Sequence, residues 1–295
     1  MRHGRQQPTE AQMKTTTLIF VITTISLTFE SALSQGGPVA KSIDTTHQSV
    51  VAILRVDSSG KAWINATGVL IHPQVILTAG HVNFDMMKLG PGGSATKGIV
   101  NFGSNAYNSQ DRRSFNWLKD IETHPDSGNL SKSFSDTTGQ LKPSMFIDVG
   151  LLFLQPPVEH IPLARLPDSS ALARWTSDHL LIGVGFGYHK TWDSTFTPNL
   201  VDGQRRQWRL QDLTLRNDLW LRTQCDTVTN LPFISMYDSG APLLLGDNVV
   251  VGVWSFMGAA TNTCAYSSWA VRIDNPRVLT WIKNRVKLRL GVDLN

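Results

Sequence analysis

The chain has 295 residues, of which 41% are hydrophobic and 17% are charged. This composition is typical of a folded protein and excludes a largely disordered chain. The 27 Lys and Arg residues and 23 Asp and Glu residues give a net charge of +4, too small and too scattered to indicate a nucleic-acid-binding protein. The two cysteines exclude a disulfide-dense scaffold and a zinc site built from cysteine alone, but they allow one disulfide.

The first element in chain order is a short apolar segment that follows a positive charge. Lys14 precedes the apolar residues 18–29, and the small residues Ala32 and Ser34 come after them. This pattern is typical of a secretory signal peptide, and the apolar core is too short to span a bilayer. We therefore expect residues 1–34 to form a signal region and the mature protein to be secreted; a buried N-terminal helix is the alternative.

The body of the chain has the pattern of a β-rich protein. Its apolar segments are short and bounded by Gly, Pro, Asn or Asp, which predicts strands at 49–56, 68–71, 75–78, 149–154, 180–184 and 249–254. Residues 85–147 contain few apolar runs and are expected to form long loops. Many strands followed by one helix predict two packed β-barrels or a large β-sandwich.

Helical spacing is clearest at the C-terminus. Asp274 or Asn275 is a good N-cap, and Pro276 suits the first helical position. Apolar residues then recur at helical spacing, whereas the basic residues between 283 and 289 are expected on the solvated face.

Three fragments contain residue types that together perform acyl transfer. His81 follows a buried strand and two small residues, Asp148 stands at the head of an apolar strand, and Ser239 lies in a tight turn. A serine hydroxyl is a weak nucleophile that needs a histidine base, and a buried carboxylate fixes the tautomer of that histidine. Each residue alone also has a structural interpretation, as a core histidine, a turn acid or a turn serine.

The order and the spacing of these residues indicate which serine-enzyme template the chain follows. They occur as His, Asp and Ser, which is the chain order of the chymotrypsin template. Positions 81 and 148 are 67 residues apart, and positions 148 and 239 are 91 apart, against about 45 and about 93 in the template. The second interval fits, and the first contains about twenty additional residues in the loop-rich region.

At these positions the chain resembles the chymotrypsin- and trypsin-like serine proteases. The resemblance is carried by LTAGH at 77–81, IDVGLL at 147–152, DSGAP at 238–242, VGFG at 184–187 and VVGVWSF at 250–256. By residue number, these five motifs follow one another within residues 45–285. The Ala164-Arg165-Leu166-Pro167 stretch after the Asp148 strand is most similar to the secreted bacterial-type branch. The resemblance implies an all-β fold of two packed six-stranded antiparallel β-barrels with a C-terminal helix. The first barrel would occupy residues 35–160 and the second residues 161–295.

The resemblance also implies roles for individual residues. His81 would be the general base, Asp148 the group that orients it and Ser239 the nucleophile. The backbone N–H groups of Tyr237 and Ser239 would form the oxyanion hole, and the substrate-binding residues would be Phe233, Ser255, Phe256 and Met257. We expect a polypeptide substrate, no cofactor, no metal site and no nucleic-acid partner, and we expect a monomer.

The chain departs from the family pattern beside the nucleophile. Tyr237 and Met257 stand where the family usually has glycine, and no I-V-G-G type start is found. Asp238, which the freed N-terminal amine binds in the family, would therefore need another partner. These departures keep open the alternative of a catalytically impaired homologue that acts as a binding module. A further alternative is an esterase that uses the same three residues and differs only in its substrate.

The resemblance also places the two cysteines near the implied substrate pocket. Cys264 follows Ser239 by 25 residues, a position suited to a bridge across that pocket. We expect a disulfide between Cys225 and Cys264, and the alternative is two free thiols.

Overall fold

The computed structural model describes most of the chain after residue 41. The described residues are 42–56, 59–83, 97–107, 111–116, 119–127, 146–169, 171–175, 180–187, 202–210, 213–215, 217–223, 234–261 and 264–294, without the side chains of 214–215, 257–261 and 264–267. All of them belong to a single compact unit that begins at Val39. The expected signal region 1–34 lies outside them. No helix in these ranges is long and apolar enough to cross a membrane.

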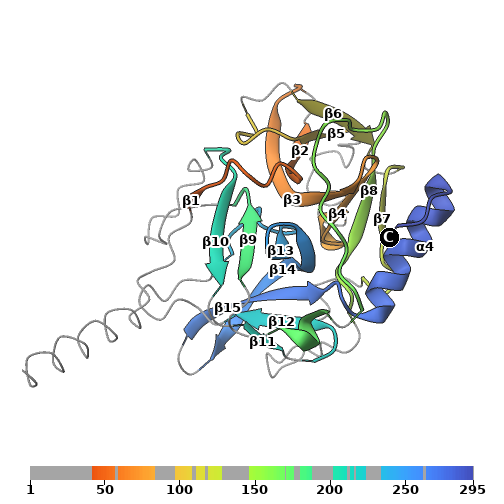
Figure 1. The fold of residues 1–295 in the computed structure, drawn as a ribbon. Helices are drawn as coiled ribbons and strands as arrows, with labels where there is room; N and C mark the ends of the chain where they lie inside the picture. The colour runs from red at the N-terminus through yellow and green to blue at the C-terminus, as the bar shows by residue number, and fades with distance from the viewer. Residues whose placement is uncertain are drawn as a thin grey trace, which may run out of the picture. The chain divides into compact units, whose positions relative to one another are not determined.

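Two antiparallel sheets and a C-terminal helix form the described fold (Figure 1). The first sheet has the order β6-β5-β2-β3-β4-β8-β7. Its strands are β2 (Val50–Val56), β3 (Ala62–His72), β4 (Val75–Thr78), β5 (Lys97–Asn101), β6 (Arg112–Asn116), β7 (Ile121–Thr123) and β8 (Gly150–Phe153).

The second sheet has the order β1-β10-β9-β13-β14-β15-β12-β11. Its strands are β1 (Ser42–Ile43), β9 (Leu181–Gly185), β10 (Arg206–Leu210), β11 (Leu213–Leu215), β12 (Trp220–Thr223), β13 (Pro242–Leu245), β14 (Val249–Thr261) and β15 (Cys264–Arg272). A short 3₁₀ helix, η2 (Ala171–Arg174), lies in the segment that leads into this sheet.

The predicted all-β fold with two antiparallel sheets is confirmed, and the strand counts differ only at the edges. The first sheet has seven strands and the second has eight, against six expected in each, and the additional strands β7, β1 and β11 lie at the sheet edges. Because β1 pairs with β10, the start of the expected first domain contributes a strand to the second sheet. The division between residues 160 and 161 stays a prediction.

The interpretation of residues 85–147 as loops is wrong for three segments. Strands β5, β6 and β7 lie in this range, and β5 pairs with both β2 and β6. In β6 the sequence RRSFN buries only Phe115, because its other side chains face outward or half outward. A strand that buries a single side chain has no apolar run, so the pattern that predicted the other strands could not find it.

The N-terminal strand is held by a buried ionic cluster. The Nε of Arg205 lies 2.7 Å from one carboxylate oxygen of Asp44, and the Nδ1 of His47 lies 2.7 Å from the other. Arg205 also donates to the carbonyl oxygen of Val50 at 3.1 Å. Asp44 is fully buried and Arg205 is 1% exposed, so this cluster fixes the segment between β1 and β2 against the strand that follows Arg205.

The C-terminal helix α4 (Pro276–Leu290) begins where the sequence predicts. Of the two candidate N-caps, Asn275 is the one used, because its side chain accepts a hydrogen bond from the N–H of Arg277 at 2.9 Å. The predicted apolar face is buried through Val278, Ile282 and Val286.

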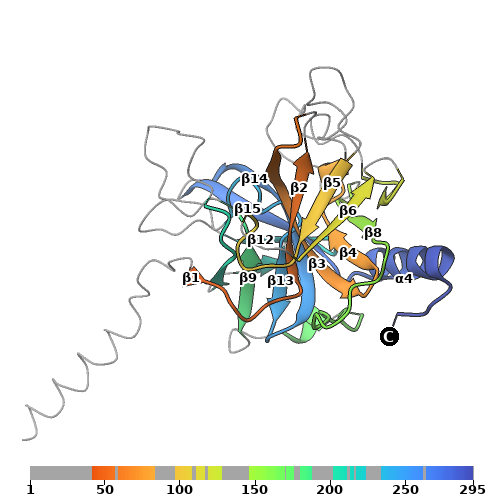
Figure 2. The same ribbon diagram turned by 90° about the horizontal axis from the view of Figure 1, so that it is seen from above.

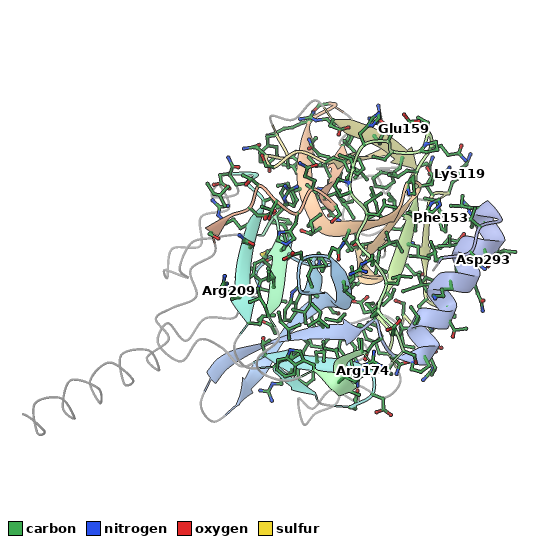
Figure 3. All side chains as sticks on the ribbon, in the orientation of Figure 1. Lys119, Phe153, Glu159, Arg174, Arg209 and Asp293 are labelled. Carbon is green, nitrogen blue, oxygen red and sulfur yellow. The ribbon has the colours of Figure 1, made fainter. Side chains whose placement is uncertain are left out.

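Helix α4 lies beside β8 in both views of the ribbon (Figures 1 and 2). Among its basic residues, Lys287 and Arg289 are exposed as expected, whereas Arg285 is half-buried. The Nε of Arg285 donates to Glu122 of β7 at 2.7 Å, and the Nε of Arg289 lies 3.4 Å from the same carboxylate. Phe153 is next to α4 in Figure 3, and the Arg289 guanidinium lies 5.0 Å from the centroid of its ring. These contacts fix the helix against the edge of the first sheet.

Candidate active site

The strand β4 ends three residues before His81 and places it at the site. The chain leaves β4 at Thr78, passes through Ala79 and Gly80, and starts a helical turn at His81. A Cβ atom at Gly80 would come within 2.0 Å of the Ser127 hydroxyl oxygen and 3.0 Å of the Val149 carbonyl oxygen. The small residue is therefore required for close approach of the His81 segment to the segment that contains Asp148.

Asp148 is fully buried and receives hydrogen bonds from two segments. The backbone N–H of His81 donates to its Oδ1 at 2.6 Å, and the His81 Nδ1 lies 2.6 Å from its Oδ2. The hydroxyl of Ser255, which is on β14, donates to the same Oδ2. This arrangement favours the His81 tautomer that carries its proton on Nδ1.

The same contacts determine the charge of Asp148. Burial alone would raise the pKa of Asp148, but the neighbouring His81 and the hydrogen bonds from His81 and Ser255 outweigh it and hold that pKa below its usual value. Asp148 is therefore a carboxylate at neutral pH, and it can stabilise a positive charge on His81.

Ser239 completes a chain of hydrogen bonds. Its Oγ lies 2.9 Å from the His81 Nε2, across the two sheets and 158 residues apart in the sequence. With the proton on Nδ1, Nε2 is the acceptor and the serine hydroxyl is the donor. The structure thus brings together His81, Asp148 and Ser239, the three residues that the sequence singled out.

The turn that carries Ser239 has an unusual backbone. Tyr237 has a φ of 75°, in the left-handed region that glycine reaches easily and tyrosine does not. Tyr237 thus adopts the glycine-like conformation that its side chain disfavours. In the part of the chain that the structure describes, no acceptor takes the N–H of Ser239, although the neighbouring N–H of Gly240 donates to Trp254 O at 2.7 Å.

The comparison with known families agrees with this geometry. The trypsin family model matches residues 41–282, which is well over half of the chain. The chain belongs to the trypsin family of serine proteases. The chymotrypsin-like fold implied by the sequence resemblance is confirmed, and membership of the bacterial-type branch stays a prediction. A comparison with curated proteins returned no match.

Asp238, the acid before the trypsin-family nucleophile, has partners close by. Its Oδ1 accepts the N–H of Gly187 at 2.8 Å, and its Oδ2 accepts both the N–H and the hydroxyl of Ser235 at 2.9 Å. Asp238 is fully buried, so these donors replace the water that the carboxylate has lost. The sequence did not identify a partner for Asp238. Two of the three donors belong to Ser235, in the same turn, and the third is the N–H of Gly187.

A β-bulge interrupts the register of β14 beside Asp148. The register of β14 with β15 shifts between Trp254 and Phe256, so Ser255 is the additional residue and its side chain turns toward Asp148. Phe256 is half-buried and stacks on Trp269, with ring centroids 5.9 Å apart.

The structure describes the other predicted binding residues only in part. The backbone of Met257 lies in β14 opposite Ser268, but its side chain is not described. Phe233 and Cys225 lie outside the described residues, as does the side chain of Cys264, so the disulfide stays a prediction. Among the residues that the structure describes, no group of three His, Cys, Asp or Glu residues could hold a metal ion.

Sequence reasoning missed Thr67, a fully buried residue of β3. Its hydroxyl donates to Tyr237 O at 2.9 Å and accepts from the N–H of Phe186 at 3.2 Å, and its own N–H donates to Ser239 O at 2.9 Å. A threonine in a strand is common, so no sequence signal marks it.

Proposed function

We propose that this trypsin-family protein is a secreted serine endopeptidase that hydrolyses peptide bonds through an acyl-enzyme on Ser239. The observation that carries the proposal is the continuous hydrogen-bonded chain from Asp148 through His81 to Ser239, with distances of 2.6 and 2.9 Å. Nucleophile, base and orienting group in such a chain have the geometry required for acyl transfer.

Acylation follows from these contacts. The Ser239 Oγ attacks the carbonyl carbon of the substrate while its proton passes to the His81 Nε2. The resulting oxyanion is stabilised by the N–H groups of Tyr237 and Ser239, and the Asp148 carboxylate stabilises the imidazolium. His81 then gives the proton to the leaving amine nitrogen as the C–N bond breaks, which leaves an ester on Ser239.

Deacylation uses the same groups with water in place of the serine. His81 takes a proton from a water molecule, whose oxygen attacks the ester carbonyl. The second tetrahedral intermediate collapses when the Ser239 oxygen leaves and recovers the proton from His81. The free acid departs, and the site returns to its starting state.

The backbone of Tyr237 supports a competent site over an impaired one. A trypsin-family oxyanion hole needs the backbone orientation that glycine supplies, and Tyr237 has a φ of 75°. Because a non-glycine residue keeps such a conformation only when its surroundings impose it, a local constraint maintains the turn.

Labelling with a fluorophosphonate probe tests the proposed function. We expect the purified protein to be labelled and Ser239→Ala to lose labelling completely, whereas Ser169→Ala, at an exposed serine, keeps it. A folded wild-type protein that is not labelled would favour a binding module. Turnover of a p-nitrophenyl ester without casein hydrolysis would favour an esterase.

Secretion is part of the proposal and has its own test. The charged start, short apolar core and small residues of the 1–34 region support it. We expect the protein in the culture medium of its expression host to begin at residue 35, as N-terminal sequencing would show. A protein retained in the cell with its first residues intact would contradict secretion.

A further inference from the structure

Hydrogen bonds hold the peptide groups on both sides of the one that carries the Ser239 N–H. In the peptide that follows Tyr237, the carbonyl accepts the Thr67 hydroxyl at 2.9 Å and the N–H of Asp238 donates to Ser235 O at 3.1 Å. In the peptide that follows Ser239, the carbonyl accepts the Thr67 N–H at 2.9 Å and the next N–H is bound by β14. The peptide that carries the Ser239 N–H lies between these two fixed groups.

Thr67 is the residue that contacts both sides of that central peptide. It is fully buried on β3, and its own carbonyl accepts the hydroxyl of Thr78 at 2.8 Å. The N–H of Phe186 donates to its hydroxyl at 3.2 Å, so the hydroxyl has both a donor and an acceptor partner. With these partners, the hydroxyl proton has one direction available, toward Tyr237 O.

We propose that the Thr67 hydroxyl is a positioning group that holds Tyr237 in its left-handed conformation and thereby keeps the oxyanion hole in shape. The proposal deepens the proposed function and rests on it. A left-handed tyrosine is sterically disfavoured, and a hydrogen bond to its carbonyl opposes relaxation to negative φ. Without the hydroxyl, Tyr237 O and Phe186 N–H would both lose a buried partner, and the turn would be free to relax.

The first experiment removes the hydroxyl and measures acylation. The variants are Thr67→Val and Thr67→Ala, with Thr67→Ser as the conservative rescue and Thr223→Val as the matched control at another fully buried threonine. The burst of p-nitrophenol from p-nitrophenyl acetate reports the acylation rate constant. We expect Thr67→Val and Thr67→Ala to lower that rate constant about 10- to 100-fold with little change in the dissociation constant of the noncovalent ester complex.

Two further readouts separate positioning from loss of fold. Thr67→Ser and Thr223→Val should keep the wild-type acylation rate. The pH midpoint of acylation should not move in Thr67→Val, because the contacts of His81 with Asp148 are untouched. Thr67→Ala is measured beside Thr67→Val because alanine places no methyl group next to the Phe186 N–H. If the valine variant does not fold, the alanine variant still provides the comparison with the wild type.

A double-mutant cycle tests the link to Tyr237 itself. Glycine adopts a φ of 75° at little cost, so Thr67→Val should lower the acylation rate constant much less in a Tyr237→Gly background than in the wild-type background. Equal losses in both backgrounds, or a wild-type burst in both hydroxyl-free variants, would overturn the proposal alone. A folded wild-type protein without a burst would overturn the proposed function and this proposal together.

Discussion

At the scale of single residues, the carboxylate of Asp148 accepts hydrogen bonds from His81 and Ser255 and donates none. An amide in its place would turn an N–H₂ group toward one of these donors and would favour the wrong His81 tautomer. We expect Asp148→Asn to lower kcat for ester or peptide hydrolysis about 10⁴-fold at neutral pH.

Steady-state kinetics on a p-nitrophenyl ester checks this prediction, with Asp247→Asn at an exposed aspartate as the control. A fall of less than about tenfold in Asp148→Asn would show that the carboxylate does not orient His81.

Gly240 is the residue of the turn that tolerates a side chain least. Its φ is 83°, and a Cβ atom would come within 2.0 Å of the Thr78 hydroxyl and 2.2 Å of the Thr67 carbonyl oxygen. We expect Gly240→Ala to lower the free energy of unfolding by about 2–4 kcal/mol, from the disfavoured backbone and the overlap together, and to slow acylation.

Gly246→Ala is the matched control in urea denaturation. Gly246 also has a positive φ, of 61°, but a Cβ atom there would have no other atom within 4 Å, so only the backbone cost of about 1–2 kcal/mol remains. Equal losses for both variants would contradict the tight packing of the turn against Thr67 and Thr78.

The sequence predicts His81, Asp148 and Ser239 because each lies in a local pattern with chemical meaning. Thr67 could not be predicted, because its importance comes from contacts 119 and 170 residues away. The conformation of Tyr237 also depends on that contact across the two sheets, and no local rule predicts a left-handed tyrosine.

At the scale of elements, the predicted strands are those with apolar runs, and the start of α4 at Pro276 follows from its capping residues. Strands β5 to β7 were missed because none of them contains a long apolar run. Strands β6 and β7 each bury one side chain, and β5 buries Gly98 and Asn101 beside Val100. The short strand β1 could not be predicted either, because two residues carry no periodicity and its place beside β10 depends on the buried Asp44 and Arg205.

The Asp44 cluster makes stability depend on pH. Burial alone would raise the pKa of Asp44, but hydrogen bonds from His47 and Thr46 and the charge of Arg205 hold it well below its usual range. A carboxyl whose pKa is lower in the folded protein stabilises it fully above the unfolded value of about 3.9, and this contribution is lost as the pH falls toward the folded pKa.

We therefore expect Asp44→Asn to lower the free energy of unfolding by about 3–5 kcal/mol at neutral pH, because Arg205 stays buried without its charged partner. The variant should also lose less stability than the wild type between about pH 5 and pH 3. Urea denaturation at several pH values checks both points, with Asp168→Asn at an exposed aspartate as the control. Parallel pH curves for wild type and Asp44→Asn would contradict the role of this cluster.

At the scale of the whole molecule, the site lies where the two sheets meet. His81 and Asp148 come from the first sheet, Ser239 and Ser255 come from the second, and Thr67 joins the two through the Ser239 turn. The sequence predicts the two-sheet architecture through its family resemblance, whereas the contacts between the sheets require the folded chain.

The central claim is that Ser239 forms an acyl-enzyme, and trapping that species tests it most directly. The protein is mixed with p-nitrophenyl acetate, quenched in acid during the burst and digested for peptide mass spectrometry. We predict a single acetyl group on Ser239 in the wild type and none there in His81→Ala. A folded wild-type protein with no acetyl group on Ser239, or with the acetyl group on another residue, would contradict the claim.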